Sequence, residues 1–190
     1  YAKLIGKTCS IDKEVFEIRE YGPGDGELAA KILIELFDQD IPIKKYQMLE
    51  VSKRFIEFQK NNIADILKQY DKSLYLRANK ILEWKLVEVD CEEFATNTDV
   101  DPINGLVIAN EIIDSFPVKV ALWQPNDEIL ELGIRISAKG DLEFQNRSAD
   151  DKLIEKVLHR KNQAKQNGHL WKTPRMLDVC LHTKRWLKIL

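Results

Sequence analysis

The chain places three glycines, Gly22, Gly24 and Gly26, between a predicted strand and a predicted helix, in the segment EYGPGDGE. Glycine costs conformational entropy on folding, so it is used mainly where the backbone needs a positive φ or approaches a ligand closely. A strand, a glycine-rich turn and a helix form a cradle for a ligand, because amides at the helix N-terminus point toward it. We therefore expect a ligand-binding loop here. A tight turn that caps the helix is the alternative.

The sequence around this loop alternates between the periodicities of strands and helices. Strands are predicted at 15–21, at 46–51, between 81 and 89, and at 106–109, with helices from 27 to about 37 and from about 53 to 69. This alternation predicts an α/β fold with a mostly parallel sheet and helices on both faces.

Two details of these elements carry further expectations. Arg19 lies inside the first strand, where a charge is costly to bury, so we expect it to reach the sheet's end or the strand to be unusually exposed. Ser52 is a suitable N-cap for the second helix. The inner side of that helix is expected to carry Phe55, Phe58, Ile63, Ile66 and Leu67.

The last third of the chain has a different pattern. Residues 118–123 and 129–136 flank the turn signal Pro-Asn-Asp, which predicts an antiparallel hairpin. After Ala149 the pattern becomes helical, and a final amphipathic helix is predicted over residues 177–190. The expected addition to the parallel sheet is therefore a β-hairpin and a helical region.

Composition excludes several classes of function. The 190-residue chain has a net charge of −2, so electrostatics favour neither nucleic acid nor an anionic membrane as a partner. No apolar run reaches the roughly 18 residues of a membrane span. The three cysteines, Cys9, Cys91 and Cys180, and the three histidines have no metal-ligand spacing, so we expect no metal site and a reducing compartment.

The glycine loop has the wrong register for a nicotinamide dinucleotide. That fingerprint is G-x-G-x-x-G, whereas this loop reads G-x-G-x-G. Two acids at its mouth, Glu20 and Asp25, would also repel a pyrophosphate. They suit a cationic ligand without phosphate, such as S-adenosylmethionine, which has a sulfonium, an ammonium and an adenosine. A nicotinamide oxidoreductase is the disfavoured alternative.

Acids at two strand ends complete the predicted cofactor site. Glu20 would meet the ammonium group, and the three glycines would let the backbone lie against the methionine part. Glu50 ends the second strand, where an acid about twenty residues past the loop binds a ribose diol through two hydrogen bonds. The alternative for Glu50 is an ordinary acid near the start of the next helix.

A second cluster follows the fourth strand. Asn110, Glu111 and Asp114 come directly after residues 106–109. Ligands of open α/β sheets bind outside the carboxyl ends of the strands, so we expect this cluster in the same crevice as Glu20 and Glu50. The alternative is an ordinary helix start with Asn110 as its cap.

Three segments, EYGPGDGELAAKILIEL, YQMLEVS and GLVIANEIIDSFPV, resemble in this order the MidA-like group of class I S-adenosylmethionine-dependent methyltransferases. The group's patterns are E-x-G-x-G-x-G, E-x-S and A-N-E-x-x-D-x-x-P-V, and all are present. The resemblance implies a Rossmann-like class I methyltransferase fold whose last strands would follow Leu190. It divides the chain into an S-adenosylmethionine-binding core, residues 1–117, and a substrate-side hairpin and helical region, residues 118–190, of the same domain.

The resemblance also implies a substrate and further site residues. The acceptor would be a protein arginine, with Glu111 and Asp114 as the candidates that hold its guanidinium and Asn110 nearer the cofactor. Acids at this place would also suit an amine or hydroxyl acceptor. Asp90 could accept a hydrogen bond from the adenine amino group, or Trp84 could pack on the adenine. A core tryptophan and a surface aspartate remain the alternative to both.

Partners and location also follow from the resemblance. Mitochondrial members of the group assist assembly of respiratory complex I, which implies a respiratory-complex subunit as the protein substrate. The location would be the bacterial cytoplasm or the mitochondrial matrix. A non-catalytic assembly factor that keeps the methyltransferase fold is the alternative function.

Overall fold

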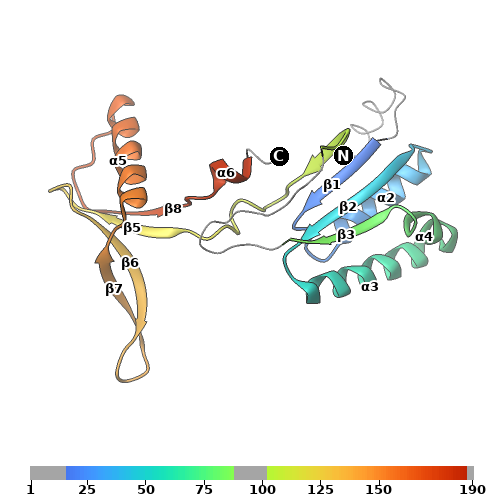
Figure 1. The fold of residues 1–190 in the computed structure, drawn as a ribbon, viewed down its shortest axis with the longest axis horizontal. Helices are drawn as coiled ribbons and strands as arrows, with labels where there is room; N and C mark the ends of the chain where they lie inside the picture. The colour runs from blue at the N-terminus through green and yellow to red at the C-terminus, as the bar shows by residue number, and fades with distance from the viewer. Residues whose placement is uncertain (1–15, 88–101, 188–190) are drawn as a thin grey trace. The chain divides into compact units, whose positions relative to one another are not determined.

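The computed structural model describes residues 16–87 and 102–187 (Figure 1). The chain divides into two compact units, an N-terminal unit of residues 1–114 and a C-terminal unit of residues 115–189. Each has its own sheet and its own hydrophobic core. No helix in the described ranges is long and apolar enough to cross a bilayer.

The N-terminal unit contains a four-stranded parallel sheet with the strand order β3-β2-β1-β4. Its elements are β1 (Phe16–Tyr21), α2 (Glu27–Asp38), β2 (Ile43–Glu50), α3 (Lys53–Tyr70), α4 (Lys72–Ala78), β3 (Leu82–Leu86) and β4 (Gly105–Ile108). The predicted α/β fold with a parallel sheet is therefore confirmed. The glycine loop connects β1 to α2, as the sequence predicts.

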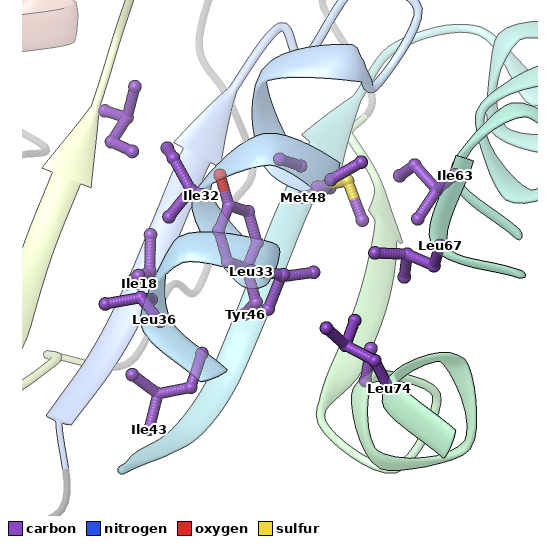
Figure 2. Close-up of a cluster of buried hydrophobic side chains, with 14 of the residues drawn as sticks. Ile18, Ile32, Leu33, Leu36, Ile43, Tyr46, Met48, Ile63, Leu67 and Leu74 are labelled. Carbon is purple, nitrogen blue, oxygen red and sulfur yellow. The ribbon is translucent and has the colours of Figure 1, made fainter. Parts of the chain in front are cut away.

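The core of this unit lies on one face of the parallel sheet (Figure 2). Ile18 of β1 and Tyr46 and Met48 of β2 are completely buried there against side chains of α2, α3 and α4. Successive strand residues point to opposite faces of a sheet. Ile18, Tyr46 and Met48 share one face, and this apolar face packs against the helices. Within the described residues, all three helices contribute to this one cluster, whereas the sequence led us to expect helices on both faces.

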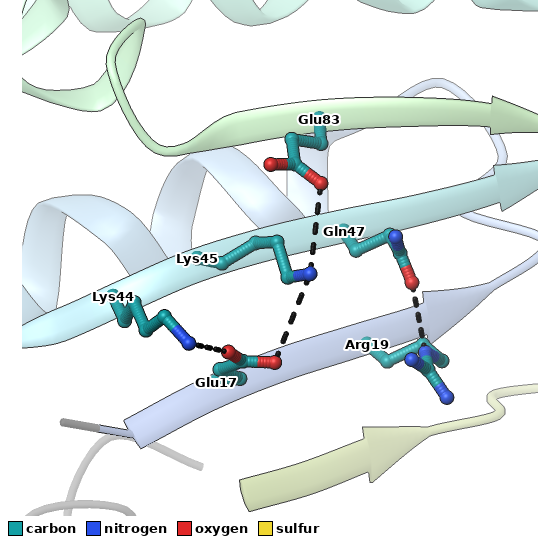
Figure 3. Close-up of polar contacts among 6 residues, drawn as sticks. All are labelled: Glu17, Arg19, Lys44, Lys45, Gln47 and Glu83. Carbon is teal, nitrogen blue, oxygen red and sulfur yellow. Dashed lines mark hydrogen bonds and ion pairs between the residues drawn. The ribbon is translucent and has the colours of Figure 1, made fainter. Parts of the chain in front are cut away.

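Charged and polar side chains occupy the other face of the sheet (Figure 3). Arg19 is only 6% exposed, so the expectation that it reaches the sheet's end or lies in an exposed strand is wrong. Its Nε donates a 2.9 Å hydrogen bond to Oε1 of Gln47, its register partner on β2. Glu17 pairs with Lys44 at 2.7 Å, which lowers the pKa of the glutamate. Hydrogen bonds across the strands thus offset the cost of burying polar groups here.

Helix α3 begins where the sequence predicts, but its buried side differs. The Ser52 hydroxyl accepts a hydrogen bond from the Phe55 amide, which confirms the N-cap. Phe55 and Phe58 are about half exposed, so their predicted inward position is wrong. Ile56 and Gln59 are buried instead, because they share one helical stripe with Ile63 and Leu67.

The C-terminal unit contains a four-stranded antiparallel sheet with the strand order β7-β6-β5-β8. Its elements are β5 (Lys119–Trp123), β6 (Ile129–Ile136), β7 (Leu142–Ser148), α5 (Asp151–Gln166), β8 (Arg175–Val179) and α6 (Thr183–Leu187). The predicted hairpin is confirmed as β5 and β6. The helix predicted over 177–190 is wrong: residues 175–179 pair with β5, and the described helical part is 183–187.

One face of this antiparallel sheet is buried, and the other exposes large apolar side chains. One face packs against α5 through a cluster that includes Trp123, Leu153 and Val157. On the hairpin of β6 and β7, the register places Ile134 opposite Phe144 and, next to them, Ile136 opposite Leu142. The large exposed side chains of this second face are Ile134, Ile136, Leu142, Phe144 and Met176.

Candidate functional site

The carboxyl ends of β1, β2 and β4 bring most of the predicted site residues to one edge of the parallel sheet. Glu20 is paired with Met48 on one side and Ile108 on the other, and Glu50 is the last residue of β2. Residues 109–114 follow directly on β4. This is the edge at which open α/β sheets bind ligands.

All three glycines of the loop have a positive φ, and two of them also pack too closely for a side chain. Gly22, Gly24 and Gly26 have φ values of 59°, 58° and 83°, a region that other residues rarely adopt. A Cβ at Gly26 would lie 2.7 Å from the Ile63 side chain, and one at Gly22 would lie 2.7 Å from Ile112 Cδ1. A Cβ at Gly24 would meet nothing within 4 Å. The outer two glycines therefore allow close packing, and the middle one borders open space.

Helix α3 holds the glycine loop from outside. Gln59 Nε2 donates a 2.8 Å hydrogen bond to the Gly24 carbonyl, and Asn62 Nδ2 donates a 3.0 Å hydrogen bond to the Asp25 carbonyl. The Asp25 side chain accepts a 2.9 Å hydrogen bond from the Glu27 amide. Asp25 therefore stabilises the start of α2 in addition to making the mouth of the loop acidic.

Glu20 is buried at the edge of the core, with 3% of its surface exposed. Its Oε2 accepts a 2.8 Å hydrogen bond from the Tyr46 hydroxyl. Burial raises the pKa of the Glu20 carboxyl, and the hydrogen bond from Tyr46 opposes part of that rise. A buried acid with one hydrogen-bond donor gains from a positively charged ligand group.

The Glu50 carboxylate is held by three donors. Its Oε1 accepts from the amides of Val51 at 2.8 Å and Ser52 at 3.0 Å, and its Oε2 accepts from Gln59 Nε2 at 2.9 Å. An ionised carboxylate has about four acceptor positions, so one on Oε2 remains for a further donor. Glu50 thus fixes the turn into α3 and can also accept from a ligand hydroxyl.

The segment after β4 passes beside the glycine loop, because the Ile112 side chain lies over Gly22. Asn110, Glu111 and Asp114 in this segment are exposed. The alternative of an ordinary helix start is wrong, since residues 109–118 are not helical. Glu111 has a φ of 50°, and such outliers cluster at ligand and catalytic sites.

Of the two candidates for adenine contact, Trp84 lies in a described strand, β3. Asp90 lies outside the described residues. Trp84 packs against the core cluster, with Lys60 Nζ 5.8 Å from its ring centre. Its Nε1 is buried and has no hydrogen-bond partner in the part of the chain that the structure describes. Trp84 is thus partly buried beside the core, and its contact with adenine stays a prediction.

Gln59 is the site residue that the sequence analysis missed. It is completely buried and joins the Gly24 carbonyl to the Glu50 carboxylate. A signal existed in its spacing, because position 59 lies on the same helical stripe as Ile56 and Ile63. A polar residue on an apolar stripe indicates a specific hydrogen-bonding role.

Comparisons with known proteins show the family and the fold. A protein-family model described as "Putative S-adenosyl-L-methionine-dependent methyltransferase" matches residues 5–190. Two crystal structures of proteins from Burkholderia thailandensis each match 83% of this chain with a TM-score of 0.60. One, 19% identical, is of a candidate methyl transferase bound to S-adenosyl-homocysteine, and the other, 21% identical, is of an uncharacterized protein of the same superfamily.

The solved relatives are much longer than this chain, which covers 35% and 36% of them. At these identities the likeness shows the fold. None of the curated proteins matches this chain.

Proposed function

The chain belongs to this family of S-adenosylmethionine-dependent methyltransferases, and we propose that the protein transfers the methyl group to a protein side chain, with arginine as the acceptor. One observation carries the cofactor assignment. Glu20 and Glu50 lie at the carboxyl ends of adjacent parallel strands, as the penultimate and the last residue, beside a loop whose middle residue, Gly24, borders open space. This arrangement suits a ligand with positive charge and no phosphate.

The described residues fit the parts of S-adenosylmethionine. Glu20, buried beside Tyr46, is placed to bind the ammonium group. The free acceptor position on Glu50 suits one ribose hydroxyl, so the structure favours a single hydroxyl contact over the two that the sequence led us to expect. Asp90 is kept as the proposed partner of the adenine amino group, and Asn110 as a residue that contacts the cofactor.

The bound cofactor supplies a sulfonium methyl group for in-line displacement. The protein's own task is then to hold the acceptor and exclude water. Glu111 and Asp114 are exposed acids on the segment whose Ile112 side chain lies over Gly22, and we expect them to bind a guanidinium together through paired hydrogen bonds. This contact would draw the positive charge toward one side of the guanidinium and leave a nitrogen on the other side to attack. As the N–CH3 bond formed and the S–CH3 bond broke to leave S-adenosylhomocysteine, that nitrogen would give its proton to one of the two carboxylates.

The motifs shared with the MidA-like group support the finer parts of the proposal. They favour arginine over another acceptor and a respiratory-complex subunit as the protein partner. They also favour the bacterial cytoplasm or the mitochondrial matrix as the location. The division of labour follows, with residues 1–117 binding the cofactor and residues 118–190 lying on the substrate side.

The test is methyl transfer by the full-length protein, with methyl-labelled S-adenosylmethionine and a cell extract as the source of acceptors. Asp114→Asn and Glu111→Gln keep shape and remove a charge. We expect each to lower incorporation by at least about 10-fold while the affinity for S-adenosylhomocysteine is unchanged, because the lost contact is made to the acceptor. Mass spectrometry should locate the label on arginine.

A surface acid on α3 provides the control. Asp65→Asn removes a charge from an exposed position and should leave incorporation unchanged. Equal incorporation by all variants would remove Glu111 and Asp114 from the acceptor site. Cofactor binding without any labelled protein would favour the assembly-factor alternative.

A further inference from the structure

One buried side chain of α3 connects the two halves of the site. Gln59 is 0% exposed, and its single amide nitrogen donates to both the Gly24 carbonyl at 2.8 Å and Glu50 Oε2 at 2.9 Å. Gly24 belongs to the glycine loop, and Glu50 belongs to the end of β2.

The orientation of this amide is fixed by chemistry. A backbone carbonyl and a carboxylate are both acceptors, so only the NH2 group of Gln59 can face them. The two hydrogens of that group are therefore committed, one to each half of the site. A carboxylate at position 59 would repel both partners, and an apolar side chain would bind neither.

The same geometry makes Gln59 a poor choice for stability alone. Its Oε1 is buried and accepts no hydrogen bond from the residues that the structure describes. Leaving a buried amide oxygen unpaired carries a desolvation penalty that methionine or leucine at this position would avoid. The glutamine is therefore best explained by the two hydrogen bonds that it donates.

We propose that Gln59 is a positioning residue that holds the Glu50 carboxylate at a fixed place relative to the glycine loop. This inference rests on the proposed function, in which the loop binds the methionine part of the cofactor and Glu50 binds its ribose. Oε1 of Glu50 is already anchored by the Val51 and Ser52 amides. Gln59 fixes Oε2, the oxygen that keeps an acceptor position for the ribose.

The first test is a double-mutant cycle in the full-length protein, with S-adenosylhomocysteine affinity measured by calorimetric titration. Gln59→Met keeps the approximate volume and removes both donors. We expect affinity to fall about 10-fold or more, the size of one hydrogen bond to a charged group. In a Glu50→Ala background the same change should matter less than about twofold, because residues that act as a unit are not additive.

Asn62→Leu is the matched control, because Asn62 lies on the same helix and binds the same loop but does not contact Glu50. If the hydrogen bond from Gln59 to Glu50 determines the affinity for S-adenosylhomocysteine, Asn62→Leu should lower that affinity by less than about threefold. Should Gln59→Met unfold, Gln59→Leu carries the same expectation. Unchanged affinity in a folded Gln59 variant, or a loss of the same size in both backgrounds, would overturn the proposal.

A cofactor-free measurement separates this inference from the proposed function. Hydrogen exchange of the Val51 and Ser52 amides should accelerate in Gln59→Met, because the carboxylate that accepts from them is released. Asn62→Leu should leave these two amides unchanged. If the wild type does not bind S-adenosylhomocysteine, the proposed function fails, while the exchange result still decides whether Gln59 positions Glu50. Equal exchange rates in wild type and Gln59→Met would contradict the positioning role.

Discussion

The Tyr46 hydroxyl donates a 2.8 Å hydrogen bond to the Glu20 carboxylate, and so links the two central strands of the parallel sheet beside the glycine loop. Tyr46 is completely buried in the core, whereas Glu20 lies where β1 enters the loop. The pair connects the folded core directly to the proposed ammonium site. A change at Glu20 should therefore affect both stability and cofactor binding.

We expect Glu20→Gln to stabilise the protein near pH 7 and to weaken cofactor binding. Burial raises the pKa of Glu20 above its ordinary value of 4.5, so folding favours the neutral carboxyl. The associated stability is fully present below that value and is lost as the pH rises through the folded-state pKa. Glutamine keeps an acceptor for Tyr46 and cannot ionise.

Thermal unfolding at pH 4 and pH 7, with S-adenosylhomocysteine titration at pH 7, measures both effects. The variant should gain in midpoint over wild type at pH 7 more than at pH 4. Its binding free energy for S-adenosylhomocysteine should become about 1.5–3 kcal/mol less favourable, as for a lost hydrogen bond between charged groups. A variant that is no more stable at neutral pH would mean that the Glu20 carboxylate is stabilised in the folded protein.

Alanine substitutions in the glycine loop should separate folding from binding. Gly24→Ala and Gly26→Ala both place a side chain at positive φ, which costs about 1–2 kcal/mol. At Gly26 the new Cβ also meets Ile63, so about 1–3 kcal/mol of overpacking should be added. At Gly24 the Cβ enters open space, where we expect it to meet the cofactor instead.

Urea unfolding and cofactor titration check this contrast, with Gly140→Ala as the control. Gly140 also has a positive φ and nothing within 4 Å of its Cβ, but it lies in the C-terminal unit. Gly24→Ala and Gly140→Ala should lose similar stability, and only Gly24→Ala should lose cofactor affinity. Full affinity in Gly24→Ala would place the cofactor away from this glycine.

The apolar face of the C-terminal sheet should affect association more than folding. Ile134 and Phe144 form a cross-strand pair and are 61% and 73% exposed. Replacing both with threonine should change the free energy of unfolding by less than about 1 kcal/mol for each residue. Self-association and binding of a hydrophobic dye should fall, because exposed apolar patches promote both.

Leu153→Ala provides the opposite case within the same unit. Leu153 is a completely buried residue of α5 that packs against the antiparallel sheet, so its truncation should cost about 2–5 kcal/mol. Light scattering measures self-association, and urea unfolding measures the free energy of unfolding. Both are applied to the wild type, the Ile134 and Phe144 double variant, and Leu153→Ala. A loss of several kcal/mol in the Ile134 and Phe144 double variant would show that another part of the protein covers this face.

Local sequence signals predicted the elements whose causes are local. The glycine loop, the Ser52 N-cap and the turn between β5 and β6 each depend on residues close together in sequence. The carboxyl-end positions of Glu20 and Glu50 followed from the strand order along the chain. These features are why the fold class could be predicted.

The features that the sequence did not predict depend on distant partners. Residues 175–179 fit a strand or a helix locally, and pairing with β5 decides between them. Arg19 is buried because Gln47 lies opposite it on β2. Gln59 contacts Gly24, 35 positions earlier in the chain, so its role was visible only in the folded structure.

Calorimetric titration of the full-length protein with S-adenosylmethionine, its demethylated product and NAD tests the central claim most directly. The wild type should bind the first two and not NAD. Glu50→Ala, with its fold verified by thermal unfolding, should bind them more weakly by about 1.5–3 kcal/mol, because the ribose loses a charged acceptor. Binding of NAD in place of S-adenosylmethionine, or full affinity in a folded Glu50→Ala, would contradict this assignment of the site.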